Sequence, residues 1–271
     1  MLAQSEAHNK RAAFLLKWPG MLVPLVFLAA LILVWEGIVR TGHWAPYALP
    51  SPATVLDRLV EGFRDHTIPI GIGQSMKRMA IGYGVSLALG ISLGVAIARF
   101  HLMERTVGIL VSGLQALPSI TWLPLALIWF GLNDKAIIFV VILGSLLAVT
   151  QATTDGVKNM PTLYVRAARN LGASGPAMYL RVILPASLPS IITGMKLGWS
   201  FAWRSLMAAE LLFLTPGLGH LLEVGREFND VAQVVAVMVV IVALGLLVDF
   251  LVFSPIERGV RRRWGLTGVR Y

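Results

Sequence analysis

Five side chains with polar groups lie inside or beside long apolar stretches of the chain: Gln115, Thr121, Trp122, Arg204 and Glu210. Arg204 is the most informative of them, because a charge within a membrane span is costly and tends to face a cavity or a partner. Its guanidinium group offers a planar fork of donors that suits the oxygens of a sulfonate, nitrate or carboxylate. We therefore expect Arg204 to line a translocation pathway that favours anions.

The alternative for Arg204 is a structural ion pair, and Glu210 is the candidate partner. Glu210 follows six residues later, which is a poor spacing for a pair on one helix. Glu210 is counted with the pathway residues here, and gating or anchoring of its helix is the role we expect for it. Both interpretations of Arg204 remain open from the sequence.

The third apolar stretch, residues 107–132, contains Pro118 and Pro124. Proline removes a backbone hydrogen bond and kinks a helix. Inside a bilayer such a break persists only where protein or a cavity satisfies the freed carbonyl groups. We expect a cavity at these prolines, and its polar lining would come from Gln115, Thr121 and Trp122.

Other chemistry finds no support in the residue pattern. The sequence has no G-x-x-x-x-G-K-[ST] phosphate loop and no H-E-x-x-H zinc pair. It has no cysteine, and its five histidines are scattered through polar segments. We therefore expect no catalytic residue and no metal site in this chain.

The composition places these residues in a membrane protein. Hydrophobic residues make up 56% of the 271 positions and charged residues 14%, whereas about a quarter of a soluble domain is charged. We predict an all-α, polytopic bundle of six transmembrane helices. The expected spans cover residues 21–39, 80–98, 107–132, 136–150, 189–214 and 231–253. The net charge of +9 is spread over the short segments between the spans, so we do not expect nucleic-acid binding.

The distribution of basic residues predicts the orientation. Fourteen Lys and Arg residues fall on the side of the two termini and seven on the opposite side, so both termini are expected in the cytoplasm. This gives a cytoplasmic segment 1–20, a transmembrane domain 21–253 and a basic cytoplasmic tail 254–271. Within the domain, we expect residues 52–64 to form an amphipathic helix outside the cytoplasm, with Ser51 as its cap and Pro52 at its first position. This helix would lie at the membrane surface or against the other helices.

Small residues mark one face of the second span. Gly82, Ser86, Gly90, Gly94 and Ala98 recur at every fourth position and so share one side of a helix. Small side chains let two helix backbones approach closely in a bilayer. We favour helix packing over a substrate role for this face.

The longest segment on the cytoplasmic side, residues 151–188, has the pattern of a compact helix-turn-helix. Arg166 to Leu171 reads as a short helix, and Gly172 fits its end, where a left-handed backbone is needed. Ser174 can start a second short helix, which Pro185 would separate from the fifth span. The alanines would lie at the tip of this projection, and a solvated connector is the alternative interpretation.

This segment resembles the signature E-A-A, three residues, G, nine residues, I-x-L-P of the membrane subunits of bacterial ATP-binding-cassette importers. Ala167 and Ala168 match the paired alanines, Gly172 matches the glycine, and nine residues then precede the final match at Val182 to Pro185. Arg166 replaces the family glutamate, which removes any ionic contact that this glutamate makes. The residues that the resemblance assigns to the loop are Arg166, Ala167, Ala168, Gly172, Ala173, Ser174, Leu184 and Pro185.

Further segments are similar to the sulfonate, taurine and nitrate branch of that family. They are Leu49-Pro50-Ser51-Pro52, Leu123-Pro124-Leu125, Trp129-Phe130-Gly131, Ala208-Ala209-Glu210 and Gly217-Leu218-Gly219. The resemblance implies a homodimer in the bacterial inner membrane, an extracytoplasmic substrate-binding protein, and separate cytoplasmic ATPase subunits that bind ATP and Mg²⁺ and dock on the loop. This chain would then hold no cofactor. The alternatives are an ion-gradient-driven secondary transporter and a membrane-embedded enzyme. The absence of a clear internal repeat and of a catalytic cluster disfavours them.

Overall fold

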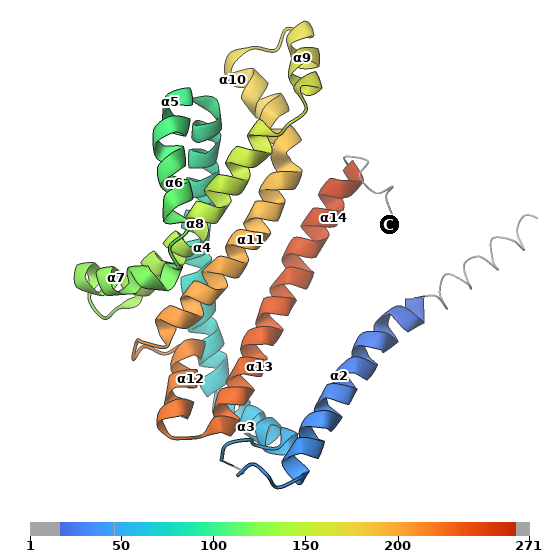
Figure 1. The fold of residues 1–271 in the computed structure, drawn as a ribbon, viewed down its shortest axis with the longest axis vertical. Helices are drawn as coiled ribbons and strands as arrows, with labels where there is room; N and C mark the ends of the chain where they lie inside the picture. Colours follow the sequence, from blue (N-terminus) through green and yellow to red (C-terminus); the bar gives the residue numbers. More distant parts are fainter. Residues whose placement is uncertain (1–16, 46, 264–271) are drawn as a thin grey trace, which may run out of the picture.

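The computed structural model describes residues 17–45 and 47–263, and these residues form helices without a strand. Five helices are long and apolar enough to cross a membrane, and a bent pair of shorter helices makes up to six. The predicted all-α bundle is therefore confirmed (Figure 1). The five helical stretches are Leu22–Arg40, Thr67–Arg99, Asp134–Lys158, Tyr179–Glu210 and Val231–Val260.

Three helices form the centre of the bundle. Helix α8 (Asp134–Lys158) packs along α4 (Thr67–Arg99) on one side and along α11 (Leu184–Glu210) on the other. The main apolar core lies between them and includes Met79, Ile137 and Leu206, all fully buried. We call this packed region the seam.

The glycine face of α4 lies against α8, as a packing role predicts. A Cβ added to Gly94 would lie 2.6 Å from the Thr150 carbonyl oxygen, and one added to Gly82 would lie 2.7 Å from Val141. Ser86 Oγ donates to the Ile142 carbonyl oxygen at 2.9 Å. Only small residues allow the two backbones to come this close.

Residues 90–94 of α4 read Gly-Ile-Ser-Leu-Gly and so have the letters of a G-x-S-x-G nucleophile elbow. They lie in the middle of the continuous helix α4, where Ser92 Oγ donates to the Ala88 carbonyl oxygen at 2.7 Å. An elbow requires a sharp strand-to-helix turn. The match therefore carries no catalytic meaning here.

The third apolar stretch is broken rather than kinked. Helix α5 (His101–Met103) and the π-turn η1 (Glu104–Gly108) lead into it, and α6 (Ile109–Leu114) forms its first half. Its second half, the 3-10 turn η2 (Ser119–Trp122) and α7 (Leu123–Phe130), is bent by 99° from the first. Pro118 immediately precedes the second half, whereas Pro124 lies in the first turn of α7, where proline is tolerated. The kink that we expected at Pro124 is wrong.

The outer helices differ in how much they contact the bundle. Helix α3 (Pro52–Arg64) has the predicted bounds, and Ser51 Oγ accepts from Thr54 N at 3.2 Å as a cap. Helix α12 (Leu218–Glu227) leads into α13 (Val231–Val248), the π-turn η4 (Asp249–Phe253) and α14 (Ser254–Arg263). Helix α2 (Lys17–Arg40) stands apart from the bundle and contacts α3 at one end (Figure 1).

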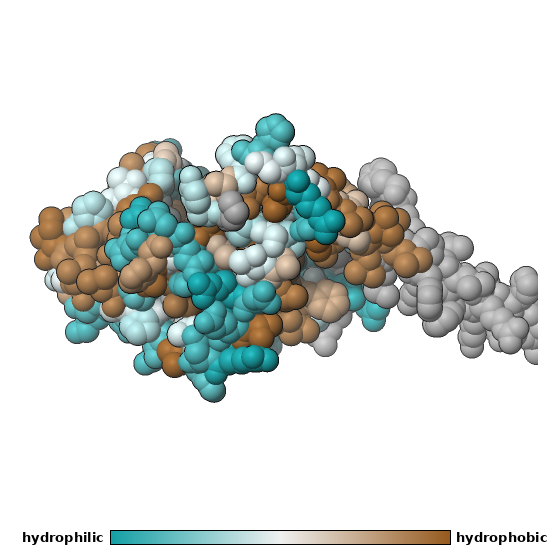
Figure 2. Space-filling view, turned by 90° about the horizontal axis from the view of Figure 1, so that it is seen from below, coloured by the Kyte–Doolittle hydropathy of each residue, from teal (hydrophilic) through white to brown (hydrophobic). Residues whose placement is uncertain are grey.

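Several boundaries differ from those expected. Helix α4 begins at Thr67 instead of residue 80, and α8 ends at Lys158 instead of residue 150. Helix α11 ends at Glu210 instead of residue 214, and the sixth span continues as a helix beyond residue 253 into α14. The end of the bundle that carries α3 and α12 is rich in hydrophilic residues, as Figure 2 shows from that side. The predicted segment 1–20 and the end of the predicted tail 254–271 lie largely outside the described residues.

At the other end, the segment 151–188 is mostly helical. Helix α8 continues to Lys158 and is followed by α9 (Thr162–Asn170), α10 (Gly175–Met178) and the π-turn η3 (Tyr179–Ile183). The chain stays helical from η3 into α11, because Pro185 occupies the first turn of α11. The separation that we expected at Pro185 is therefore wrong.

Candidate functional site

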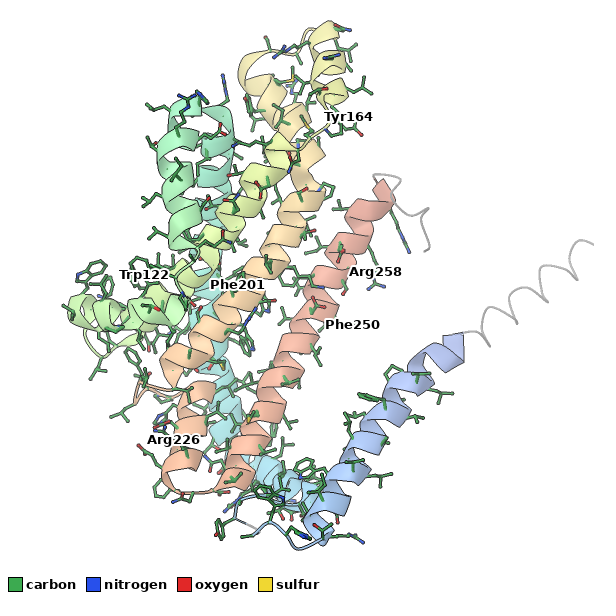
Figure 3. The ribbon with its side chains drawn as sticks, in the orientation of Figure 1. Trp122, Tyr164, Phe201, Arg226, Phe250 and Arg258 are labelled. Carbon is green, nitrogen blue, oxygen red and sulfur yellow. The ribbon has the colours of Figure 1, made fainter. Side chains whose placement is uncertain are left out.

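An open cavity of about 390 Å³ lies where the third apolar stretch breaks. Its walls come from the break at residues 115–122, from α8 and from α11 (Figure 3). Its polar lining residues are Gln115, Ser119, Trp122, Arg204 and Ser205. Gln115 and Trp122, predicted from the prolines, and Arg204, predicted from its charge within a span, thus line one cavity. Thr121 belongs to η2 beside it but is not among the lining residues.

Arg204 carries the charge of this cavity. Its Nε donates to the Ser200 carbonyl oxygen at 3.1 Å, and its Cζ lies 5.0 Å from the centre of the Phe201 ring. No carboxylate of the described residues comes within 4.0 Å of its guanidinium nitrogens. The positive charge is therefore offset by a carbonyl dipole and an aromatic face, and it remains available to an anion.

Glu210 lies elsewhere, fully buried at the end of α11. Arg78 of α4 donates to Glu210 Oε1 at 2.7 Å, and Ser75 Oγ donates to Oε2 at 2.7 Å. The backbone N–H of Gly219 donates to Oε2 at 3.0 Å. The ion pair between Arg204 and Glu210, left open by the sequence, is excluded, because Glu210 is occupied by Arg78.

Arg78 joins three elements of the seam. It is 3% exposed, and besides Glu210 it contacts Asp134 at the start of α8, at 2.9 Å. Ser75 Oγ also accepts from the backbone N–H of Leu218 at the start of α12. Arg78 is one of the seven basic residues that we expected outside the spans, on the side opposite the termini. A charge one residue before the apolar run at Met79 was a signal that it could be drawn inside with a carboxylate partner.

Two serines of the cavity were also missed. Ser119 Oγ and Ser205 Oγ are 2.6 Å apart and so link the break to α11. Gly144 of α8 faces Ser205 so closely that any side chain there would collide with it. Their positions beside Pro118 and Arg204 were the only signals in the sequence. The hydroxyl pair holds the broken half against α11 and adds polar atoms to the cavity.

The predicted loop signature forms a compact projection that we call the knob, residues 159–183. Helix α9 ends at Asn170, and Gly172 follows with a φ of +83°. The N–H of Gly172 donates to the Arg169 carbonyl at 2.9 Å, and that of Ala173 donates to the Ala168 carbonyl at 2.9 Å. This pair of bonds is a Schellman motif, so the predicted left-handed helix end is confirmed.

The two signature alanines face opposite ways. Ala167 is exposed, whereas Ala168 is 7% exposed and packs with Met178 and Ile183 in a small apolar cluster. The expectation that both alanines lie at the tip is therefore wrong for Ala168. Its small side chain lets α9 pack on the helix that follows. The most exposed large apolar side chain of the knob is instead that of Leu171, at 89%.

The remaining loop residues support this arrangement. Arg166 and Ser174 are exposed, Ala173 is half-buried, and Leu184 and Pro185 form the start of α11. Among the described residues there is no group of three or more His, Cys, Asp or Glu side chains that could hold a metal.

Comparisons with known proteins place this geometry in a family. The family described as "Binding-protein-dependent transport system inner membrane component" matches residues 86–262. The taurine transport system permease protein of Escherichia coli is 29% identical and aligns over 92% of this chain and 93% of its own length. The nitrate import permease protein of Synechocystis is 27% identical, with 85% and 86% covered.

A solved structure has the same fold. The inward-facing MetNI methionine ABC transporter aligns with a TM-score of 0.63 at 19% identity, over 72% of this chain and 96% of that chain. The resemblance to importer permeases of the sulfonate, taurine and nitrate branch is confirmed, because family and relatives align over most of the chain. This chain belongs to the family of inner membrane components of binding-protein-dependent transport systems.

Proposed function

We propose that this chain forms the translocation pathway of an ATP-driven importer for a small anion, such as an alkanesulfonate, taurine or nitrate. The observation that carries the proposal is the exposed, carboxylate-free Arg204 on the wall of the 390 Å³ cavity. That volume lies within the usual range of small-molecule sites. A guanidinium group in such a wall offers two parallel donors to a sulfonate or nitrate. The relatives named for taurine and nitrate support an anion of this size.

The break in the third stretch supplies the rest of the proposed pathway lining. Gln115 and Trp122 can donate hydrogen bonds to anion oxygens, and the linked hydroxyls of Ser119 and Ser205 lie in the same cavity. Glu210 does not reach this cavity; it anchors α11 through Arg78, so we assign it a positioning role. Its carboxylate is already neutralised, which removes the buried acid that a proton-coupled carrier would need.

Thiol labelling tests the pathway directly, because the natural chain has no cysteine. A single Gln115→Cys variant is treated with an anionic or a cationic methanethiosulfonate reagent of similar size. We expect the anionic reagent to react about tenfold faster, since Arg204 attracts it. In the Gln115→Cys/Arg204→Gln double variant this preference should disappear. Equal rates for the two reagents in the presence of Arg204 would contradict an anion pathway here.

The knob is the proposed docking site for separate cytoplasmic ATPase subunits, which would bind ATP and Mg²⁺. We propose that a second copy of the chain completes the pathway in the bacterial inner membrane and that a substrate-binding protein delivers the anion from outside. The Schellman turn holds Leu171 outward at the end of α9. Burial of this exposed leucine in a partner's groove would remove apolar surface from water and so favour docking. Arg166, in place of the family glutamate, would present a positive charge beside it.

Co-purification with the ATPase subunit tests this docking. A Leu171→Glu variant should lose the ATPase subunit, because it places a charge in the contact. The matched control is Leu214→Glu, which changes a similarly exposed leucine (82%) in the segment that follows α11, away from the knob. Retention of the ATPase subunit by Leu171→Glu, or equal loss in both variants, would exclude the knob as the specific contact.

A further inference from the structure

A second cavity, of about 720 Å³, lies beneath the knob. Its floor is formed by the ends of α4 and α8, and its roof by α9 and the turn that follows it. Its polar lining residues are Arg99, Lys158, Thr162, Arg169, Ser174 and Tyr179. The proposed function gives this space no role.

The lining of this cavity is positively charged. It contains three cationic side chains and no carboxylate. Lys158 is neutralised from outside by Glu104, at 2.7 Å. Within the described part of the chain, Arg99 and Arg169 have no carboxylate within 4.0 Å of their guanidinium nitrogens. The Arg99 Cζ lies 5.0 Å from the centre of the Tyr179 ring. Two guanidinium groups with unused donor capacity therefore share one cavity.

The cavity lies at the ends of two apolar helical stretches. Arg99 is the last residue of the apolar stretch Thr67–Arg99, and Lys158 is the last of Asp134–Lys158. We therefore expect both side chains at the membrane–water boundary on the side of the knob, where phospholipid phosphates reside. Basic pockets between helices at this boundary bind anionic headgroups.

The lining also suits an amphiphile rather than a free ion. Apolar side chains stand beside the cations and hydroxyls, and they come from both floor and roof: Val157, Met160, Val165, Met178 and Ile183. The volume exceeds what a single inorganic anion needs. A phosphate diester could occupy the cationic part while its glycerol and first acyl carbons contact the apolar part.

We propose that this cavity binds the phosphate of an anionic phospholipid headgroup, held by Arg99 from the floor and Arg169 from the roof. The bound headgroup would connect the end of α4 to the knob and so stiffen the segment on which the ATPase subunit is proposed to act. The binding itself requires only the membrane location of the chain. Failure of the transport proposal would therefore leave this site testable.

Thermal unfolding of the full-length chain in neutral detergent tests the site. The probes are phosphatidylglycerol, phosphatidylcholine and inorganic phosphate, each titrated separately. We expect phosphatidylglycerol to raise the unfolding midpoint saturably and phosphatidylcholine to have no such effect. The Arg99→Gln/Arg169→Gln variant should require at least about tenfold more phosphatidylglycerol, because each basic group near the surface contributes to the attraction.

The matched control is Arg105→Gln/Arg181→Gln, which removes the same charge from exposed positions nearby that do not line the cavity. It should respond to phosphatidylglycerol as the natural chain does. If the Arg99→Gln/Arg169→Gln variant does not fold, the single Arg169→Gln variant, altered only on the exposed knob, replaces it in the titration. If inorganic phosphate alone raised the unfolding midpoint equally, the ligand would be a soluble anion and the proposed lipid headgroup would be overturned. If phosphatidylglycerol raised the unfolding midpoint of all variants equally, the proposal that Arg99 and Arg169 form a binding site would be overturned.

Discussion

The seam and the cavity at the break in the third apolar stretch each contain an arginine within a membrane-spanning helix. The two arginines differ in burial and in their partners. In the seam, Arg78 is 3% exposed and contacts two carboxylates, Glu210 and Asp134. In the cavity, Arg204 is exposed and meets a carbonyl oxygen and an aromatic ring. A buried charge must be paired, so Arg78 is committed to the fold. Arg204 has no such commitment, which leaves its charge for a ligand.

The difference extends to the surroundings of the two residues. In the seam, small residues of α4 let its backbone approach α8 so closely that a larger side chain at Gly82 or Gly94 would collide with α8. The cavity exists because the third stretch breaks and turns through 99° before it can fill the space. Two helices, α8 and α11, border both regions. The residue type alone therefore does not show whether an arginine stabilises the fold or binds a ligand. The presence or absence of a carboxylate partner distinguishes the two roles.

Of the variants that test this comparison, Arg78→Ala is expected to lower the free energy of unfolding most. Removing one partner leaves Glu210 buried without its cation, which costs about 3–5 kcal/mol. Denaturant or thermal unfolding in detergent measures this loss. The double variant Arg78→Ala/Glu210→Ala should be less destabilised than the sum of the single variants, because the uncompensated charge is gone. Strict additivity would show that the two residues do not act as a pair.

A smaller effect is expected where the seam is closed by glycine. The methyl group of Gly94→Ala would lie 2.6 Å from Thr150 O and from Thr153 Cβ, so α4 and α8 must separate. Such overpacking costs about 1–3 kcal/mol. Gly84→Ala is the matched control, because no atom lies within 4 Å of its added methyl group. If Gly94→Ala and Gly84→Ala lower the free energy of unfolding equally, α4 and α8 are not packed as closely as described.

The smallest effect concerns Asp65, in the exposed turn that leads into α4. The backbone N–H and the hydroxyl of Thr67 donate to its carboxylate at 3.0 and 2.7 Å, and they hold the pKa of Asp65 below its usual range. A carboxylate with a lowered pKa in the folded state stabilises the protein above its unfolded pKa of about 4. That stabilisation is lost as the pH falls through the folded pKa.

Comparison with Asp65→Asn isolates this contribution. The midpoint difference between the natural chain and the variant should be constant from about pH 7 to 5 and should shrink below about pH 4. Because Asp65 is exposed, the difference stays well below that of Gly94→Ala. A difference that grows as the pH falls would contradict the lowered pKa.

The sequence predicted much of the architecture because its signals are local. Apolar runs, the Ser51-Pro52 helix start and the left-handed Gly172 each depend on nearby residues, and the structure confirms all three. The glycine face of α4 was also readable, since period and residue size determine which helices approach closely.

The ion pair of the seam could not be predicted from the sequence, because it joins residues that are far apart along the chain. Arg78 and Glu210 are 132 positions apart, and no local pattern joins them. For the same reason the link between Ser119 and Ser205 was missed. The inward turn of Ala168 depends on how the knob packs on η3, which the signature does not encode. Local helix rules also failed at Pro124 and Pro185, because a first-turn proline continues a helix that begins just before it.

The central claim is that Arg204 provides the anion contact of the pathway and contributes little to stability. It is tested by ATP-driven uptake of labelled taurine and nitrate in proteoliposomes with the ATPase subunit and binding protein. Arg204→Ala, Arg204→Lys and the natural chain are compared at subsaturating substrate, and each is also unfolded thermally. We predict that Arg204→Ala loses at least about tenfold in uptake with an unchanged midpoint, and that Arg204→Lys keeps part of it. Undiminished uptake by Arg204→Ala, or a loss that follows a lowered midpoint, would contradict the account.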